Sequence, residues 1–265
     1  MRDKNKLINQ IVVLAVILIL LFFSLRKGEE ENKDDHVASD AIVKEDEEEK
    51  ADAEDEAFQK EMLKKYPPIK SPIDYNNNGI DDYADLVIGA RKDAANHPVY
   101  DGAYVSENNG YSDSDIGVCT DVIWRAMKEA GYSMRSMLNA DIDKHLEDYD
   151  NIENKPDPNI DFRRVKTLKP FYDKYLTNLE IKLTDPSQWQ PGDIVIFETS
   201  TYKHIGILSD KRNRNEYPLV IHNTGQENRE ENFITYLPIT GHYRFDASKI
   251  APDLLIPWEE GEDGQ

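Results

Sequence analysis

Three residues of the sequence have the types and the spacing needed for nucleophilic catalysis. Cys119, the single cysteine, lies in the run GVCTDVIW, directly before an apolar pattern with helical spacing. A thiol at a helix N-terminus lies at the positive end of the helix dipole, which favours the reactive thiolate. His204 in KHIGILSD and His222 in LVIHNTG lie near the ends of two expected strands. Because a nucleophile needs a base and the base needs an orienting partner, these side chains could form a Cys–His–His triad.

The same residues allow two other interpretations. A lone cysteine is often a small buried hydrophobic residue, and the domain would then bind an envelope peptide without catalysis. A Cys–His–His set can also hold a zinc ion with one open coordination position, which would make the protein a zinc-dependent hydrolase. The residues alone leave both alternatives open.

The elements that must position these side chains change from helices to strands along the chain. Helical spacing and end signals predict helices at Asp82–Asn96, Thr120–Ala130, Ser133–Tyr149 and Leu168–Leu176. Short runs rich in β-branched or aromatic residues predict strands at Asp193–Glu198, His204–Ser209, Pro218–His222 and Gly241–Phe245. Helices followed by strands predict an α+β domain in which N-terminal helices pack on a C-terminal antiparallel sheet.

Several segments resemble bacterial protein families. The runs PGDIVIF, HIGILSD and VIHN are similar to the C-terminal half of NlpC-type domains, the papain-like cell-wall cysteine peptidases and amidases. GVCTDVIWRA, DPNIDFRRV, IHNTG and ITGHYRF resemble the bacterial domain-of-unknown-function 1287 family, over roughly Ile73 to Phe245. The resemblance implies a papain-like fold, with Cys119 as nucleophile, His204 as general base and acid, and His222 as the orienting residue.

The resemblance also implies amide hydrolysis through a thioester, with peptidoglycan stem peptides as the substrate; acyl transfer would share the same intermediate. The chain departs from the NlpC-type pattern at two places. It has Val-Cys-Thr where Asp-Cys-Ser is common, and Glu107 stands where a Tyr usually supports the oxyanion. The backbone N–H of Cys119, free at the start of a helix, is therefore the expected oxyanion donor.

Four residues are candidates for substrate binding. In NIDFRRV, two adjacent arginines follow an aspartate, and Asn223 follows His222. A pair of guanidinium groups can form a fork that binds a carboxylate, and stem peptides carry free carboxylates. We therefore expect Asp161, Arg163, Arg164 and Asn223 to face the substrate. The alternative for the aspartate and the two arginines is a structural ion pair.

The segment from Asp74 to Asp85 fits the calcium-loop template. Gly79 occupies the sharp turn. The expected oxygen ligands are Asp74, Asn76, Asn78, the carbonyl of Ile80, Asp82 and Asp85. Two amides in place of carboxylates predict a modest affinity, suited to extracellular calcium. The alternative is an Asn/Gly turn that caps the helix beginning at Asp82. Calcium would be structural, and catalysis requires no cofactor.

The net charge of the chain limits the classes of partner that it can bind. It contains 32 Lys and Arg against 52 Asp and Glu, for a formal net charge of -20. Polyanion binding needs a basic surface, so nucleic acid is not an expected partner. One cysteine excludes an internal disulfide and a cysteine-rich zinc site.

The predicted organisation has five parts. Residues 1–6 form a cytoplasmic stub, and the apolar run 7–25 is long enough for an uncleaved transmembrane anchor. Residues 26–65 are an acidic, disordered tether, because too few apolar residues are present to offset chain entropy. Residues 66–258 form the catalytic domain and 259–265 a frayed tail. We predict a monomeric, single-pass membrane protein whose domain lies on the extracytoplasmic side.

Overall fold

The computed structural model describes residues 50–150, 152 and 155–264. The predicted membrane anchor, 7–25, lies outside this part of the chain. Within the described part, no helix is both long and apolar enough to cross a bilayer. The chain divides into two units, Met1–Phe58 and Gln59–Gln265, and the second holds the catalytic candidates.

The described end of the predicted tether is helical instead of extended. Residues 50–58 of the first unit and 59–65 of the second are both in helical conformation. The segment is rich in Ala, Glu and Lys, which favour helix over coil. In the second unit, Met62 is buried and the Gln59 amide donates a 3.0 Å hydrogen bond to the Arg212 carbonyl. Acidic composition alone therefore predicted neither the helix nor the contact of Gln59 with Arg212.

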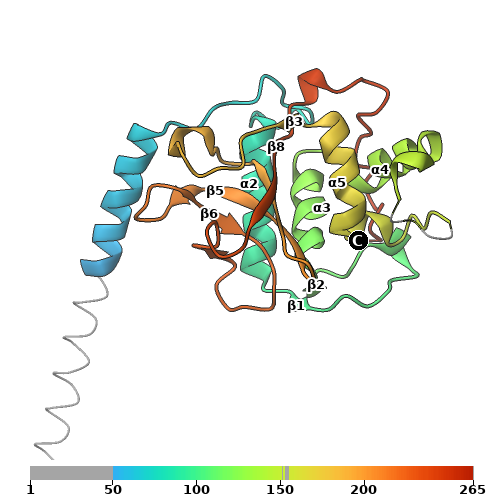
Figure 1. Ribbon diagram of the computed structural model, residues 1–265, viewed down its shortest axis with the longest axis horizontal. Helices are drawn as coiled ribbons and strands as arrows, with labels where there is room; N and C mark the ends of the chain where they lie inside the picture. The colour runs from blue at the N-terminus through green and yellow to red at the C-terminus, as the bar shows by residue number, and fades with distance from the viewer. Residues whose placement is uncertain (1–49, 151, 153–154, 265) are drawn as a thin grey trace, which may run out of the picture. The chain divides into compact units, whose positions relative to one another are not determined.

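The second unit combines helices with an antiparallel sheet, as Figure 1 shows. The helices are α2 (Asp82–Asn96), α3 (Cys119–Glu129), α4 (Met134–Lys144) and α5 (Val165–Tyr175). The six-stranded sheet has the order β3-β8-β4-β5-β6-β7. Its strands are β3 (Thr177–Asn178), β4 (Ile194–Glu198), β5 (Lys203–Arg212), β6 (Pro218–Ile221), β7 (Glu230–Glu231) and β8 (Ile239–Arg244). This confirms the α+β prediction of helices followed by an antiparallel sheet.

One helix is shorter than the sequence predicts. Ser133 caps the N-terminus of α4 through its side chain, but the helix ends at Lys144 and a 3-10 turn follows at Leu146–Asp148. The Tyr149 hydroxyl donates a 2.6 Å hydrogen bond to the Asp141 carboxylate, so the chain folds back on α4. A tertiary contact thus ended a helix that propensity alone would continue.

A pair of short parallel strands, β1 (Val99–Tyr100) and β2 (Ile116–Gly117), leads into α3. The helix α3 packs closely on α2 because Gly89 has no side chain. A Cβ at Gly89 would lie 2.7 Å from the Cα of Ala126. Close packing of these helices fixes the direction of α3 and hence the place of its first residue, Cys119.

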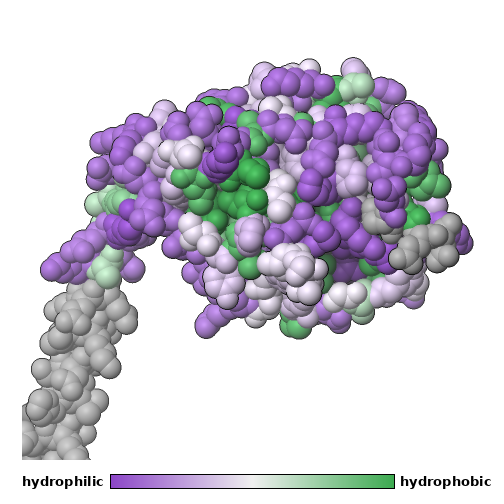
Figure 2. Space-filling model, in the orientation of Figure 1, coloured by the Kyte–Doolittle hydropathy of each residue, from purple (hydrophilic) through white to green (hydrophobic). Residues whose placement is uncertain are grey.

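Both faces of the central strands are buried. Ile194 and Ile196 of β4 pack in the cluster that contains the helices, whereas Val195 and Phe197 pack with Trp189 on the opposite face. Figure 2 shows a largely hydrophilic surface, interrupted by a hydrophobic area over the region that contains α2 in Figure 1. A sheet covered on both faces is a rigid support for side chains at the ends of its strands.

The C-terminal segment is packed where the sequence predicts a frayed tail over 259–265. Glu262 accepts hydrogen bonds from the Tyr111 hydroxyl, at 2.7 Å, and from the Ser133 hydroxyl, at 2.6 Å. Asp263 is buried and forms an ion pair with Lys128. Acidic composition alone suggested a solvated end, but these carboxylates have partners on α3 and around α4.

Candidate functional site

The structure brings the two predicted catalytic histidines into contact. His204 lies in β5 and His222 directly follows β6, and the two strands pair in antiparallel fashion. The Nε2 atom of His204 is 2.9 Å from the Nδ1 atom of His222. Both residues are buried. The predicted proximity of the two histidines is therefore found, through the β5–β6 hairpin.

Cys119 lies beside this pair at the first position of α3. The backbone N–H of Ile205, the residue after His204, forms a hydrogen bond with the Cys119 sulfur. The Tyr202 hydroxyl lies 3.4 Å from Nδ1 of His204. Burial, and the charge that a Cys119 thiolate would carry, raise the pKa of Tyr202. The sulfur, the Tyr202 hydroxyl and His204 therefore share one small region.

The protonation states differ from the sequence-based expectation. Burial raises the pKa of the Cys119 thiol to about 12, outweighing the helix start and the Ile205 N–H. Burial and then the neighbouring His222 lower the pKa of His204 to about 3. Burial and the charge of Arg229 lower the pKa of His222 to about 4. At neutral pH the resting site is thus a thiol beside neutral imidazoles, because burial penalises every charged form.

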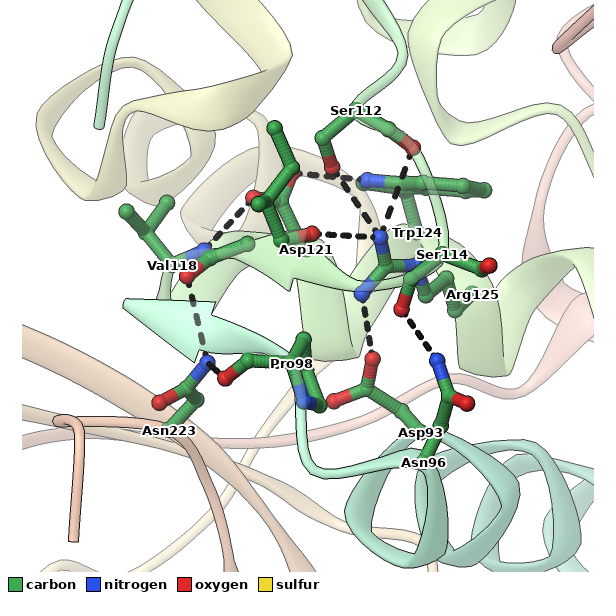
Figure 3. A network of polar contacts seen from close by, with 12 residues as sticks. Asp93, Asn96, Pro98, Ser112, Ser114, Val118, Asp121, Trp124, Arg125 and Asn223 are labelled. Atoms are coloured by element: carbon green, nitrogen blue, oxygen red, sulfur yellow. Dashed lines mark hydrogen bonds and ion pairs between the residues drawn. The ribbon is translucent and has the colours of Figure 1, made fainter. Parts of the chain in front are cut away.

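A polar network holds the segment that leads to Cys119 (Figure 3). The Arg125 guanidinium donates to the Ser112 hydroxyl at 3.1 Å and to the carbonyls of Asp113 and Ile116 at 2.7 and 2.8 Å. It also pairs with the buried carboxylate of Asp93 on α2. One side chain of α3 therefore ties the preceding loop to two helices.

The sequence predicts that Asn223 contacts the substrate, but its side chain binds backbone carbonyls within the domain. It is buried, and its amide donates to the carbonyls of Pro98, at 3.3 Å, and Gly117, at 3.1 Å (Figure 3). Since Asn223 directly follows His222, this contact connects the histidine hairpin to the chain just before Cys119. Asn223 thus relates the positions of His222 and Cys119.

The predicted arginine fork is not formed. Arg163 makes a bidentate contact with Asp121, at 2.8 and 2.9 Å, and both side chains are almost fully buried. Arg164 is exposed and lies 3.4 Å from the buried Asp161. Arg163 therefore supports α3 from within, and only Arg164 of the pair reaches solvent. The sequence could not reveal this, because Asp121 is 42 residues from its partner.

A pocket with a volume of about 440 Å³ opens at Cys119. Its lining includes Tyr100, Tyr104 and the cationic side chains of Arg164 and Lys203. Burial, and then the charge of a Cys119 thiolate, raise the pKa of Tyr100 to about 12. A larger pocket of about 520 Å³ is lined by residues of α2 and α3 and does not include Cys119. We place the candidate site at the smaller pocket because Cys119 lines it.

The calcium-loop candidates are partly gathered. Asp74 accepts hydrogen bonds from the backbone N–H groups of Asn78 and Gly79, at 3.1 and 2.9 Å. The amide groups of Asn76 and Asn78 donate to the Asp85 carboxylate, at 3.0 to 3.1 Å. The backbone N–H of the loop residue Ile80 donates to the Asn78 amide oxygen. These contacts close the loop around Asp85.

Asp82 turns away from the other loop ligands. It accepts a 2.7 Å hydrogen bond from the buried Tyr132 hydroxyl and one of 3.0 Å from the Tyr75 N–H. Burial raises the pKa of Asp82 and of Asp85. The described residues contain no group of three or more His, Cys, Asp or Glu side chains arranged to hold a metal.

The histidine geometry also bears on the zinc interpretation. A shared ion needs ligand atoms that point at a common centre. Here Nε2 of His204 and Nδ1 of His222 face each other at hydrogen-bond distance. No metal-holding group that includes Cys119 is found among the described residues. The facing nitrogens suit a hydrogen bond between the two rings, and the zinc interpretation stays a prediction.

Sequence reasoning missed one carboxylate at the histidine pair. Nε2 of His222 lies 3.2 Å from the Oε1 atom of Glu231. Glu231 belongs to the two-residue strand β7, which pairs with β6. A strand this short has no hydrophobic periodicity, so only the register of the hairpin could have indicated the contact.

The fold and the site define an α+β domain with a buried cysteine beside a histidine pair. The chain belongs to the family described as "Domain of unknown function (DUF1287)", whose sequence model matches residues 87–245. The chain is also similar to "Uncharacterized protein YijF" of Escherichia coli (strain K12). The two are 32% identical over 198 residues, 71% of this chain and 93% of that protein. No solved structure matches significantly. The resemblance to the family is confirmed, while that to NlpC-type hydrolases stays a prediction.

Proposed function

We propose that this protein is a cysteine amide hydrolase, a peptidase or amidase with a papain-like arrangement of catalytic groups. The observation that carries the proposal is the 2.9 Å contact between His204 and His222 next to Cys119 at the start of α3. A nucleophile, a base and an orienting group then meet in one buried site at the edge of a pocket.

The reaction begins with proton transfer, since the resting thiol is neutral. His204 removes the thiol proton as the Cys119 sulfur attacks the amide carbonyl carbon. The first backbone N–H of α3 is the donor for the resulting oxyanion, because it has no intrahelical partner. His204 then gives its proton to the leaving amine, and the C–N bond breaks to leave a thioester. Water, deprotonated by His204, attacks the thioester and releases the acid and the thiol.

The pocket favours a substrate that carries a carboxylate. The cationic side chains of Arg164, Lys166 and Lys203 line it, in a chain whose formal net charge is -20. Local positive charge in an acidic protein attracts anionic groups to that place. Peptidoglycan stem peptides carry free carboxylates, and the apolar run 7–25 would anchor the domain on the extracytoplasmic side of a membrane. We therefore propose stem peptides as the substrate class.

The proposal is tested with purified muropeptides and the Cys119→Ala variant. We expect wild-type protein to release peptide fragments, and an electrophilic peptide analogue that alkylates thiols to form a stable adduct on Cys119 that mass spectrometry locates. The variant should retain its fold and release nothing. Equal fragment release by both proteins would exclude thiol catalysis. Binding without turnover by both would instead support the envelope peptide-binding function.

We also propose that the Asp74–Asp85 loop binds calcium weakly, because the loop gathers Asp74, Asn76, Asn78 and Asp85. We expect 10 mM Ca²⁺, about tenfold above a millimolar Kd, to stabilise the fold by about 1.4 kcal/mol. The melting temperature should then rise by about 3–6 °C and return with a chelator. Asp85→Asn should abolish the rise, whereas Asp81→Asn, whose carboxylate binds the Ser71 N–H instead, should keep it. Equal melting temperatures with and without Ca²⁺ would refute this site.

A further inference from the structure

Glu231 lies at the end of a series of contacts that begins at the Tyr202 hydroxyl and passes through His204 and His222. The order is Tyr202 hydroxyl to Nδ1 of His204 at 3.4 Å, then Nε2 of His204 to Nδ1 of His222 at 2.9 Å. The last contact joins Nε2 of His222 to Glu231 at 3.2 Å. Each histidine therefore uses both ring nitrogens, and each nitrogen has a defined neighbour.

The direction of this chain follows from hydrogen-bonding chemistry. A neutral imidazole has one N–H donor and one acceptor nitrogen, while a carboxylate only accepts. Facing Glu231, His222 must carry its proton on Nε2, so its Nδ1 accepts. His204 must then donate from Nε2, which leaves its Nδ1 without a proton. Nδ1 of His204 is the nitrogen on the side of Tyr202, where the Cys119 sulfur also lies.

We infer that Glu231 is a positioning residue that selects the tautomers of both histidines and thereby makes Nδ1 of His204 the base toward Cys119. The inference rests on the proposed cysteine hydrolase function for its catalytic meaning. No proton moves to Glu231: when His204 gains the thiol proton on Nδ1, its Nε2–H still donates to His222, and the carboxylate charge stabilises the cation through that relay.

The other groups around the pair do not select a tautomer. The Gln226 amide nitrogen is 3.3 Å from both ring nitrogens of His222, so it is directed at neither. The Tyr202 hydroxyl can donate or accept. Burial and, to a smaller extent, the Arg229 cation lower the pKa of His222. The Arg229 guanidinium donates to the Asn223 amide oxygen and to the Pro98 carbonyl. The Cys119 sulfur accepts from the backbone N–H of Ile205, the residue after His204, and this contact does not involve either ring.

The neighbouring glutamate has a different set of partners. Glu230 accepts from Arg91 at 2.6 Å, from the Ser209 hydroxyl at 2.5 Å and from Lys211 at 3.0 Å. Adjacent residues of a strand point to opposite faces, which explains why only Glu231 reaches His222. The side chain of Glu231 is 35% exposed, so its replacement disturbs less packing than a core change would.

The test is imidazole ¹⁵N NMR of the full chain, for wild type, Glu231→Gln and Glu227→Gln. Glu227 is exposed in the connection between β6 and β7, and its replacement controls for the loss of one negative charge. We expect both wild-type histidines as Nε2–H tautomers, with His222 shifting to a mixture only in Glu231→Gln. Nδ1–H on His204 in the wild type would overturn the inference without any variant, as would unchanged tautomers in folded Glu231→Gln.

Cys119 alkylation over a range of pH gives the second readout. We expect Glu231→Gln to slow alkylation at neutral pH by about tenfold and to move the profile to higher pH, because the His204 imidazolium loses the carboxylate charge that stabilises it through His222. Glu231→Asp should recover part of the rate, and Glu227→Gln should match wild type. If His204→Asn leaves alkylation unchanged, the proposed function fails, while the NMR result still decides the role of Glu231.

Discussion

Replacing His204 with Asn is expected to lower muropeptide turnover by about 10³-fold, within the range measured for general bases. Burial raises the pKa of the Cys119 thiol to about 12, so without a base almost no thiolate forms at neutral pH. His204 is the proposed base, and the residue after it, Ile205, binds the Cys119 sulfur through its N–H. Asn cannot accept and return a proton. The loss should appear mainly in kcat, since the pocket wall that binds the substrate stays in place.

The pH profile of muropeptide turnover by the wild-type protein tests the same site. A base acts in its unprotonated form, and burial lowers the pKa of His204 to about 3. Activity should therefore persist well below the usual histidine pKa and fall only in strongly acidic solution. His145→Asn, on an exposed histidine, is the matched control and should retain full turnover. A His204→Asn variant with wild-type kcat and an intact fold would refute the assignment of the base.

Replacing Asp121 with Asn is expected to lower the free energy of unfolding by about 3–5 kcal/mol, the cost of breaking a buried ion pair. Asp121 is fully buried and accepts both contacts of the Arg163 fork. It also accepts 2.8 Å and 2.6 Å hydrogen bonds from the Trp124 indole and the Val118 N–H. The variant leaves the Arg163 cation buried without a charged partner, which is why the effect should exceed that of a surface pair.

Urea denaturation measures this loss, and Lys92→Gln is the matched control. Lys92 pairs with Glu129 on the surface, at 2.7 Å, where an ion pair contributes at most about 1 kcal/mol. A double variant, Asp121→Asn with Arg163→Met, should be more stable than the sum of the single losses predicts, because neither charge is then left alone. Additive losses, or a single loss no larger than the control, would contradict the role of this pair.

Local patterns predicted the elements that carry the site. The helix at Asp82–Asn96 is found with the expected bounds, and the Cys119 helix and the two histidine strands are found within a few residues. Each depends on neighbours a few positions away, which is the range over which periodicity and capping act. The two-residue strands β1, β2, β3 and β7 were not predicted, because a strand this short has no period.

The sequence by itself determined the α+β class, the helix that begins at Cys119 and the hairpin that pairs His204 with His222. Only the tertiary structure decided which polar side chains meet: Arg163 with Asp121, Asp82 with Tyr132, and His222 with Glu231. It also makes Cys119 a neutral thiol where the sequence predicts a thiolate, because burial outweighs the dipole of a helix N-terminus. Periodicity is a property of adjacent residues, whereas burial and ion pairing depend on which distant segments pack together.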